Sequence, residues 1–548
     1  MGSKPLQGTT SRAPKVAVLL LALLAVTMAG GGSNGPQGPR RRVLWINWDG
    51  AAISLVRPML EAGRLPQLAV LETEGEVAAA QSVFPTLTAP GFAALWTGAP
   101  PSINGITGNR VPPPGEPVTA GVNGFSAEML RAEPVWAAVA RQGKRVVALE
   151  TPQGYPLVLF EPSGRFGGSY SHRQRLASGY ARRLFYGSAL PADGEPIPRI
   201  EGEPVPSSMQ NVATGTVRPR LWRWPLQAAV GPVEGAPEQL WVWSFDDPDT
   251  PGNGYDAVLV SADPQGRSAV RVPVQAANPQ RLHPETQAVP PGFVQIEVDA
   301  KRGPIPLYLR CWQLAADGTP RCYHSEARVE LSSDAALSAT LEAAAAGFVS
   351  NGGSASYQRG DFGPPLWEGG DGSAEARYLD TVALVVGHLS ARHRAVAAAS
   401  DWDLLITYLP YPDEAMHLWW GWVAPGSPAS DISVGARLRP FLERVVQWLD
   451  ATLGTTRKAA GEGITLVISS DHGHLPANRL FRPNPVLQQA GLLSIRQGPS
   501  GAEVELADTR VLYYSGNNAY LLVNGTDRRG GVVPDERREQ VLAAAERA

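Results

Sequence analysis

Three hydrophobic stretches of the sequence end in acidic or imidazole side chains. VLWINWDG stops at Asp49, LLITYLPYPDEAMH carries Asp413 and His417, and ITLVISSDHGH carries Asp471 and His472. Carboxylates and imidazoles are ligands that Zn²⁺ accepts, and a mixed oxygen and nitrogen set also suits Mn²⁺. Each residue alone has an ordinary explanation as a helix cap, a surface pair or a turn. Their joint position after hydrophobic stretches predicts a site for divalent metal ions.

The spacing of these residues says how they could meet. Asp413 and His417 are four positions apart, so a helical turn that begins at Pro412 would place both on one face. Asp471 and His472 are adjacent and must lie in an irregular loop if both face one centre.

Thr88 lies in the stretch FPTLTAPGFAALWTG, just before a predicted helix over residues 89–97 that Gly98 closes. Threonine is a common helix cap at such a position. A hydroxyl there also lies at the positive end of the helix, where a phosphate group binds readily. Beside a divalent cation the same hydroxyl becomes more acidic and acts as a nucleophile. Both interpretations of Thr88, cap and nucleophile, are open at this point.

The elements that must position these residues are strands and helices in alternation. The near-continuous hydrophobic stretches are typical of strands buried on both faces, and helical patterns over residues 374–399 and 434–453 lie between them. This pattern predicts an α/β sandwich with a mostly parallel sheet, whose ligands gather beyond the carboxyl ends of the strands. Short alternating stretches over residues 239–333 predict antiparallel strands in a β-rich insertion.

The 548 residues are too many for one minimal core, and we predict the following segments. They are a signal peptide or anchor (1–30), a linker (31–42), the first part of the α/β core (43–238), the β-rich insertion (239–350), and the second part of the core (351–548), which we expect to be truncated at its C-terminus.

The net charge of the chain bears on nucleic-acid binding, and its N-terminal sequence bears on export from the cytoplasm. A net charge of -3 and a single short basic run, residues 40–42, predict no nucleic-acid partner. Basic residues precede an apolar run over residues 16–26, which small residues follow, as in a signal peptide. We therefore expect export to the periplasm, the cell exterior or the outer side of a membrane. An uncleaved N-terminal segment would be the only contact with a membrane.

Cys311 and Cys322 are the only cysteines, and they flank the turn-like sequence ADGTP. In an exported protein we expect a disulfide across this hairpin, with two free thiols as the alternative.

The motifs WDG, PTLTAPGFAALWTGAPPSINGITGN, YLPYPDEAMH and SSDHGH, in this order, resemble the type I phosphodiesterase/nucleotide pyrophosphatase family of the alkaline phosphatase superfamily. The resemblance covers residues 42–187 and 374–492 and implies an alkaline-phosphatase-like α/β/α sandwich. It implies that one of two metal ions, Zn²⁺ or else Mn²⁺, is held by Asp49, Thr88, Asp471 and His472. It implies that the other ion is held partly by Asp413 and His417, and that Thr88 is transiently phosphorylated. Thr86 is a weaker rival, because the family nucleophile stands two before the proline.

Two departures from the family pattern concern the site. The family usually has an asparagine after the proline of the nucleophile motif, where its amide holds a phosphoryl oxygen, and this chain has Gly91. Only the backbone of Gly91 could bind phosphate, and Asn104 and Asn109 are possible substitute donors. The family also supplies a further histidine from well downstream, whereas His474 is the last histidine here. We expect a truncated chain, with His474 or a water molecule as the alternative.

The resemblance implies an exported hydrolase of small-molecule or nucleotide-like phosphate esters. The alternatives are a metal- or phosphate-binding protein with impaired catalysis, and a phosphomonoesterase or phosphonate hydrolase. A sulfatase is excluded, since neither cysteine lies in the required motif. The histidines outside the motifs are expected at the surface: His172, His283, His324, His388 and His393.

Overall fold

A computed structural model describes residues 41–155, 174–190, 217, 219–250, 254–427, 431–477, 479–498, 501–514 and 520–548. The predicted signal peptide or anchor lies outside these residues. Among the described helices, none is long and apolar enough to cross a membrane.

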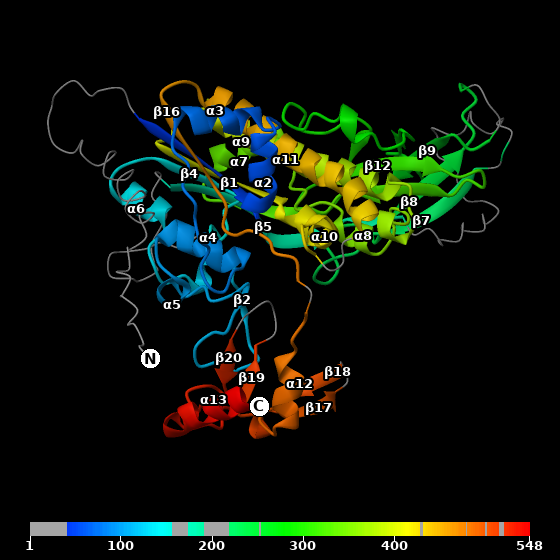
Figure 1. Ribbon diagram of the computed structural model, residues 1–548. Helices are drawn as coiled ribbons and strands as arrows, with labels where there is room; N and C mark the ends of the chain where they lie inside the picture. Colours follow the sequence, from blue (N-terminus) through cyan, green and yellow to red (C-terminus); the bar gives the residue numbers. More distant parts are fainter. Residues whose placement is uncertain are drawn as a thin grey trace.

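The central sheet has six strands in the order β14-β5-β4-β15-β1-β16 (Figure 1). All neighbours are parallel except β14 and β5. The strands are β1 (Arg42–Asp49), β4 (Val146–Leu149), β5 (Gln174–Phe185), β14 (Ala327–Ser332), β15 (Leu404–Pro412) and β16 (Ile464–Ser469). The predicted mostly parallel sheet is confirmed.

Helices cover both faces of this sheet. Alternate residues of a strand point to opposite faces, and apolar side chains on each face pack against a layer of helices. Leu44 and Ile46 of β1 join one core with the long helices, whereas Trp45 joins a second core with Phe92 and Trp96. The first layer contains α2 (Ile53–Glu61), α3 (Pro66–Glu74), α7 (Ala335–Ala344), α9 (Ser373–Ala398) and α11 (Ile432–Ala460). The second contains α4 (Thr88–Thr97) and α6 (Val135–Arg141). The α/β/α sandwich is confirmed.

Two four-stranded antiparallel sheets form the β-rich part of the molecule. One contains β7 (Arg220–Pro225), β8 (Gln239–Phe245), β9 (Ala257–Ser261) and β10 (Val270–Val272). The other contains β6 (Ser188–Ala189), β11 (Phe293–Val298), β12 (Ile305–Leu314) and β13 (Pro320–His324). Cys311 and Cys322 face each other on β12 and β13 and form the expected disulfide.

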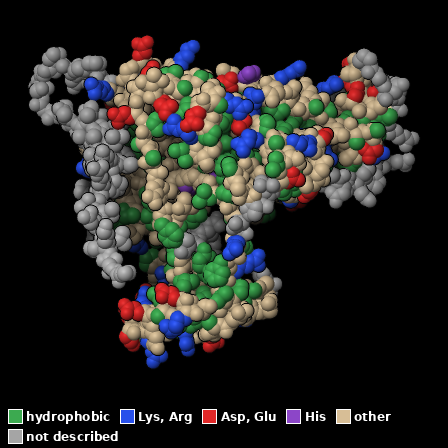
Figure 2. All heavy atoms as spheres, in the orientation of Figure 1, with side chains coloured by type: hydrophobic (Ala, Val, Ile, Leu, Met, Phe, Trp, Pro, Cys, Tyr) green, Lys and Arg blue, Asp and Glu red, His purple; other side chains and the backbone are tan. Residues whose placement is uncertain are grey.

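The C-terminal residues form a small unit below the main body, coloured orange to red in Figure 1. It contains α12 (Pro483–Gln489), β17 (Ile495–Gly498), β18 (Gly501–Val504), β19 (Val511–Tyr513), β20 (Leu521–Val523) and α13 (Arg538–Arg547). Val118, from the loop between β2 (Arg110–Val111) and β3 (Val122–Asn123), is buried in its core. Figure 2 shows a narrow waist between this unit and the body, and charges of both signs mixed over the visible face.

Candidate functional site

The predicted site residues follow three adjacent strands of the central sheet. The strands β15, β1 and β16 are neighbours, and after a shift in register Asp49 pairs with Pro412, the residue before Asp413. Because the carboxyl ends of parallel strands meet at one edge of a sheet, their following residues converge there. The structure thus brings together Asp49, Thr88, Asp413, His417, Asp471 and His472.

Asp49 is the last residue of β1 and is buried. Its Oδ2 accepts a hydrogen bond from the Tyr408 hydroxyl at 2.6 Å, whereas its Oδ1 has no hydrogen-bond partner. Burial and repulsion from Asp471 and Asp413 raise the pKa of Asp49 well above its ordinary value. Helix α2 begins at Ile53 with Ala52 as its N-cap, so Asp49 does not cap this helix.

Asp471 and His472 lie in the irregular loop after β16, as their adjacency predicts. Asp471 Oδ1 accepts from the Gly50 N–H at 3.2 Å, and its buried Oδ2 has no hydrogen bond but lies 3.3 Å from His472 Nε2. His472 Nδ1 lies 3.1 Å from the Gly473 carbonyl, which can only accept, so Nδ1 carries the proton. Nε2 therefore carries the lone pair and can accept a hydrogen bond or bind a metal ion, and burial lowers the pKa of His472.

Thr88 is the first residue of α4, and its hydroxyl donates to His472 Nε2 at 3.1 Å. The N-cap of α4 is Leu87, and no side chain caps this helix end. The interpretation of Thr88 as a helix cap is therefore wrong. Thr86 is exposed, and its hydroxyl donates locally to the Val83 carbonyl at 3.1 Å, away from the other site residues.

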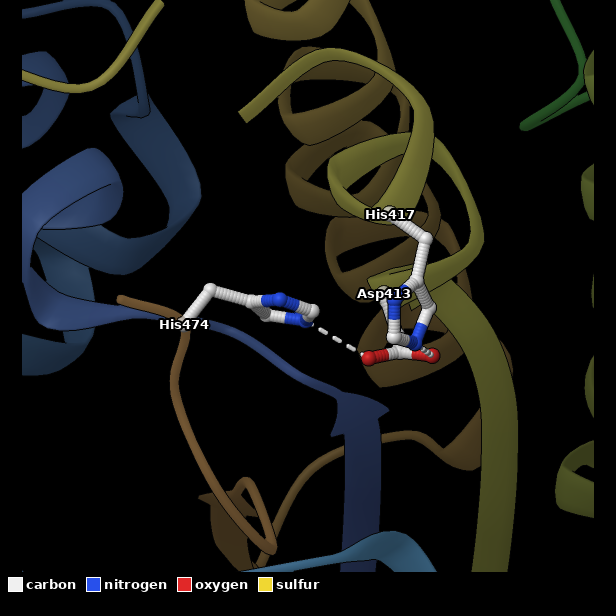
Figure 3. A group of neighbouring side chains, drawn as sticks. All are labelled: Asp413, His417 and His474. Carbon is white, nitrogen blue, oxygen red and sulfur yellow. Dashed lines mark hydrogen bonds and ion pairs between the residues drawn. The ribbon is translucent and has the colours of Figure 1, made fainter. Parts of the chain in front are cut away.

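Asp413 and His417 lie on one face of α10 (Asp413–Val423), as their spacing predicts (Figure 3). His417 Nε2 is 3.3 Å from Asp413 Oδ2, and His474 Nε2 reaches Asp413 Oδ1 from the opposite side at 2.6 Å. Burial pushes the pKa of Asp413 up, but hydrogen bonds from both histidines outweigh it and hold the pKa below its ordinary value. The Asp413 hydrogen bond raises the pKa of His417.

The donor atoms of this site fit divalent cations. They form two sets whose atoms lie within 4.8 Å of one another: Asp49, Asp413 and His472, and Asp413, His417 and His474. Asp49 and Asp471 each have one oxygen fixed by a hydrogen bond and one buried oxygen that makes no hydrogen bond and faces His472 Nε2. Buried carboxylate oxygens that lack a hydrogen bond are costly unless a cation binds them. The oxygen and imidazole donors suit Zn²⁺ or Mn²⁺.

Gly91 is held against the loop of Asp471. A Cβ at this position would lie 2.9 Å from both Cβ and the backbone oxygen of Asp471. The Gly91 N–H, expected to contact phosphate, instead donates to the Leu87 carbonyl at 2.9 Å. This correction follows from the helix starting at Thr88, because its fourth residue already makes the first helical hydrogen bond.

The two asparagines considered as substitute donors differ in their surroundings. Asn104 is buried, and its amide bonds the Ala99 carbonyl and the Ile106 N–H within its own turn. Asn109 Oδ1 accepts from the Ala89 N–H at 3.0 Å, in the first turn of α4 beside Thr88. Asn109 is therefore the side-chain amide of this pair that lies at the candidate nucleophile.

Two residues that position the site were missed from the sequence. Tyr408 holds Asp49, and a tyrosine within the buried strand β15 was a signal, since its hydroxyl needs a partner. Gly50 adopts φ +62°, and a Cβ there would lie 2.7 Å from Asp413 Oδ1 and 2.8 Å from His474 Nε2. The glycine directly after Asp49 was the corresponding signal.

The expectation that the other histidines lie at the surface holds for His283 alone among the described ones. His324, His388 and His393 are buried, so this prediction is wrong for them. The last two lie on α9, which is buried nearly all round between the sheet and its neighbours. His172 lies outside the described residues.

Comparisons with known proteins identify a family. Residues 43–271 and 315–548 match the family described as type I phosphodiesterase / nucleotide pyrophosphatase. Two structures of phosphonoacetate hydrolase from Sinorhizobium meliloti 1021, in complex with phosphonoformate and with phosphonoacetate, are 28% and 27% identical. Each match covers 26% of this chain and 34% of the hydrolase, about a third of its length, with a TM-score of 0.20, too low to support a structural comparison. No curated protein gives a match.

Proposed function

The chain belongs to the type I phosphodiesterase/nucleotide pyrophosphatase family of phosphoric ester hydrolases, and from this premise we propose a two-metal mechanism with Thr88 as covalent nucleophile. The observation that carries the proposal is the Thr88 hydroxyl, which lies 3.1 Å from His472 Nε2, the atom that also faces Asp49 Oδ1 and Asp471 Oδ2. Asp49, Asp471 and His472 would hold one ion beside Thr88, and Asp413 and His417 would contribute to the other.

Two bound divalent cations, Zn²⁺ or Mn²⁺, would stabilise the negative charge that develops on the phosphoryl oxygens and favour ionisation of the Thr88 hydroxyl. Thr88 Oγ loses its proton to solvent and attacks phosphorus, forming the Oγ–P bond while the bond to the leaving alcohol breaks. The alcohol takes a proton from solvent. Water then attacks phosphorus and loses a proton to solvent, the Oγ–P bond breaks, Thr88 Oγ takes a proton from solvent, and the phosphate monoester is released.

Residues around Thr88 support this role by position. The first turn of α4 lies beside the phosphorus site, and its positive end favours a phosphate group. Asn109 holds the Ala89 N–H and so places its own amide in the same turn. The side chain of Asn109, with two donor hydrogens on its nitrogen, would bind a phosphoryl oxygen. Asn109 would thus replace the asparagine amide that the family usually has at the position of Gly91.

Phosphorylation of Thr88 is tested by acid quenching and mass spectrometry. During turnover of a chromogenic diester we expect the Thr88 peptide to gain a phosphoryl group that still carries the second alcohol of the diester, and Thr88→Ala should lose activity by more than about 10³-fold. Thr86→Ala is the matched control and should retain activity, because Thr86 is exposed and bonds only locally. Undiminished turnover in Thr88→Ala would reject the nucleophile.

The same assay separates the alternatives. Rates on a monoester, a diester and a phosphonate, measured with the metal content, distinguish a phosphodiesterase from a phosphomonoesterase or phosphonate hydrolase. Bound metal without hydrolysis of any of the three would indicate a binding protein with impaired catalysis. We propose a small-molecule phosphate ester or nucleotide-like compound as substrate, because the family acts on such esters.

Export from the cytoplasm is a further part of the proposal. It rests on the signal-like sequence of residues 1–30, and the disulfide between Cys311 and Cys322 supports it, because such bonds persist in oxidising compartments. Cell fractionation of the full chain, compared with a chain lacking residues 1–30, tests it. Equal distribution of the two would contradict export.

A further inference from the structure

We propose that His474 is the third protein ligand of the ion held by Asp413 and His417. The inference rests on the proposed function, which supplies this second ion. It gives the ligand a different origin from that in the family, where the corresponding histidine comes from well downstream. In this chain the ligand would come from the same loop as His472.

The first argument is the convergence of donor atoms. Asp413 Oδ1 is 2.6 Å from His474 Nε2, and Asp413 Oδ2 is 3.3 Å from His417 Nε2 (Figure 3). Two donors that share a tetrahedral Zn²⁺ ion at ordinary ligand distances lie about 3.4 Å apart. The distance from Asp413 Oδ2 to His417 Nε2 already has this value, and one donor atom from each of the three residues lies within 4.8 Å of the other two. The Asp413–His474 pair would need to open by less than about 1 Å.

The second argument is the space at the meeting point of these donors. Gly50 lies against both residues, and a Cβ there would be 2.7 Å from Asp413 Oδ1 and 2.8 Å from His474 Nε2. The backbone at Gly50 is left-handed, with φ +62°, which glycine adopts without strain. A residue without a side chain therefore borders the two donor atoms that would bind the ion.

The third argument is the geometry of the loop that carries both histidines. His472 and His474 are two positions apart in the irregular loop after β16, and both rings lie at the site. Their ring centres lie 5.5 Å apart, and the His417 and His474 ring centres lie 5.0 Å apart. His472 faces Thr88 while His474 faces Asp413, so one short loop would supply a ligand to each ion.

A role as hydrogen-bond donor to Asp413 is the structural alternative for His474, and one substitution separates the two roles. Glutamine at position 474 can still donate a hydrogen bond through its amide but lacks the imidazole lone pair. His474→Gln should therefore preserve Asp413 orientation and weaken the metal site. If His474 only orients Asp413, this variant should bind metal as the unaltered protein does.

The experiment is a Co²⁺ titration of the full chain, followed by absorption of the bound ion and by metal analysis. The unaltered protein should bind two equivalents. His474→Gln should bind the second equivalent at least about tenfold more weakly and with a changed spectrum. His417→Ala should lose the same equivalent, and His283→Ala, which removes an exposed histidine bonded only to Glu285, should bind both.

Two further outcomes decide between this inference and the proposed function. Two tight equivalents with an unchanged spectrum in His474→Gln would overturn the role of His474 and leave the two-metal proposal intact. Fewer than two equivalents in the unaltered protein would overturn both. Circular dichroism of each variant in EDTA shows whether it folds. If His474→Gln does not fold, His474→Asn serves in its place, because asparagine also donates through its amide, lacks the imidazole lone pair and should weaken the same equivalent.

Discussion

Replacing Gly91 by asparagine should lower activity, although it restores the residue that the family usually has at this position. A Cβ at residue 91 would lie 2.9 Å from Cβ and the backbone oxygen of Asp471, and 3.2 Å from its carbonyl carbon. These atoms belong to the backbone or adjoin it, so they cannot turn aside as the end of a long side chain can. The substitution therefore pushes on the loop that carries Asp471 and His472.

Two magnitudes compete in this substitution. A side-chain donor to a phosphoryl oxygen is worth about 10²–10³ in rate, or about 2.7–4 kcal/mol in the transition state. That gain requires the new amide to face phosphorus, whereas the Cα–Cβ direction at residue 91 points into the Asp471 backbone. Overpacking of this kind costs about 1–3 kcal/mol in stability. The substitution therefore overpacks the Asp471 loop without placing the new amide near phosphorus. We expect lower stability and weaker metal binding.

The assay compares Gly91→Ala and Gly91→Asn by thermal unfolding, by calorimetric titration with Zn²⁺ and by hydrolysis of a chromogenic diester. Gly91→Ala should already show most of the loss of stability and of metal affinity, because the clash begins at Cβ. Gly421→Ala is the matched control, since Gly421 is an exposed helical glycine whose Cβ would meet nothing within 4 Å. It should keep full activity and gain up to about 1 kcal/mol in stability.

One result would refute this reasoning. Gly91→Asn could keep the unfolding temperature of the unaltered protein and hydrolyse the diester about 10²-fold faster. The Asp471 loop would then have moved aside without loss of stability. The amide would then reach phosphorus from residue 91.

Two other predictions concern buried polar groups. Tyr408→Phe removes the donor to Asp49 Oδ2, so metal affinity in calorimetric titration should fall about 10–100-fold, and unfolding by denaturant should show a loss of about 1–3 kcal/mol. Unchanged affinity would mean that Tyr408 does not hold Asp49 in place. His324 has its pKa lowered by burial to about 4, so below pH 6.5 the unfolded chain binds a proton that the folded chain does not. The free energy of unfolding should therefore fall by up to about 3 kcal/mol between pH 6.5 and 4, and His324→Phe should flatten this slope in denaturant titrations. Parallel pH profiles for the two proteins would contradict the assignment.

The parts of the site that depend on local pattern could be predicted from the sequence. Asp49 and Asp471 follow hydrophobic strands, and parallel strands place their carboxyl ends together, so convergence needed no long-range information. The four-residue spacing of Asp413 and His417 likewise predicted one face of a helix. The α/β class followed from the same alternation of strands and helices.

Other features depend on contacts between distant parts of the chain. The close approach of Gly91 to Asp471 joins residues 380 positions apart, and no local pattern announces it. His388 and His393 look like polar breaks in a helix, yet α9 is covered on nearly all sides, so both are buried. Whether His474 faces Asp413 was equally undecided, because it depends on how the loop after β16 turns.

Two glycines in other parts of the chain lie against the segments that carry the proposed ligands. Gly50 borders Asp413 and His474, and Gly91 borders Asp471. A displacement of one loop therefore moves ligands of both proposed ions.

Burial keeps the pKa of Asp49 and Asp471 high, so at neutral pH the metal-free site holds carboxyl groups that resist ionisation. Bound cations would remove this penalty, and because they bind only the folded arrangement they would stabilise the whole sheet edge in proportion to the logarithm of their concentration. A substitution at either glycine should therefore lower both the free energy of unfolding and the metal affinity. A variant that changes only one of these two quantities has not acted through the glycine contacts.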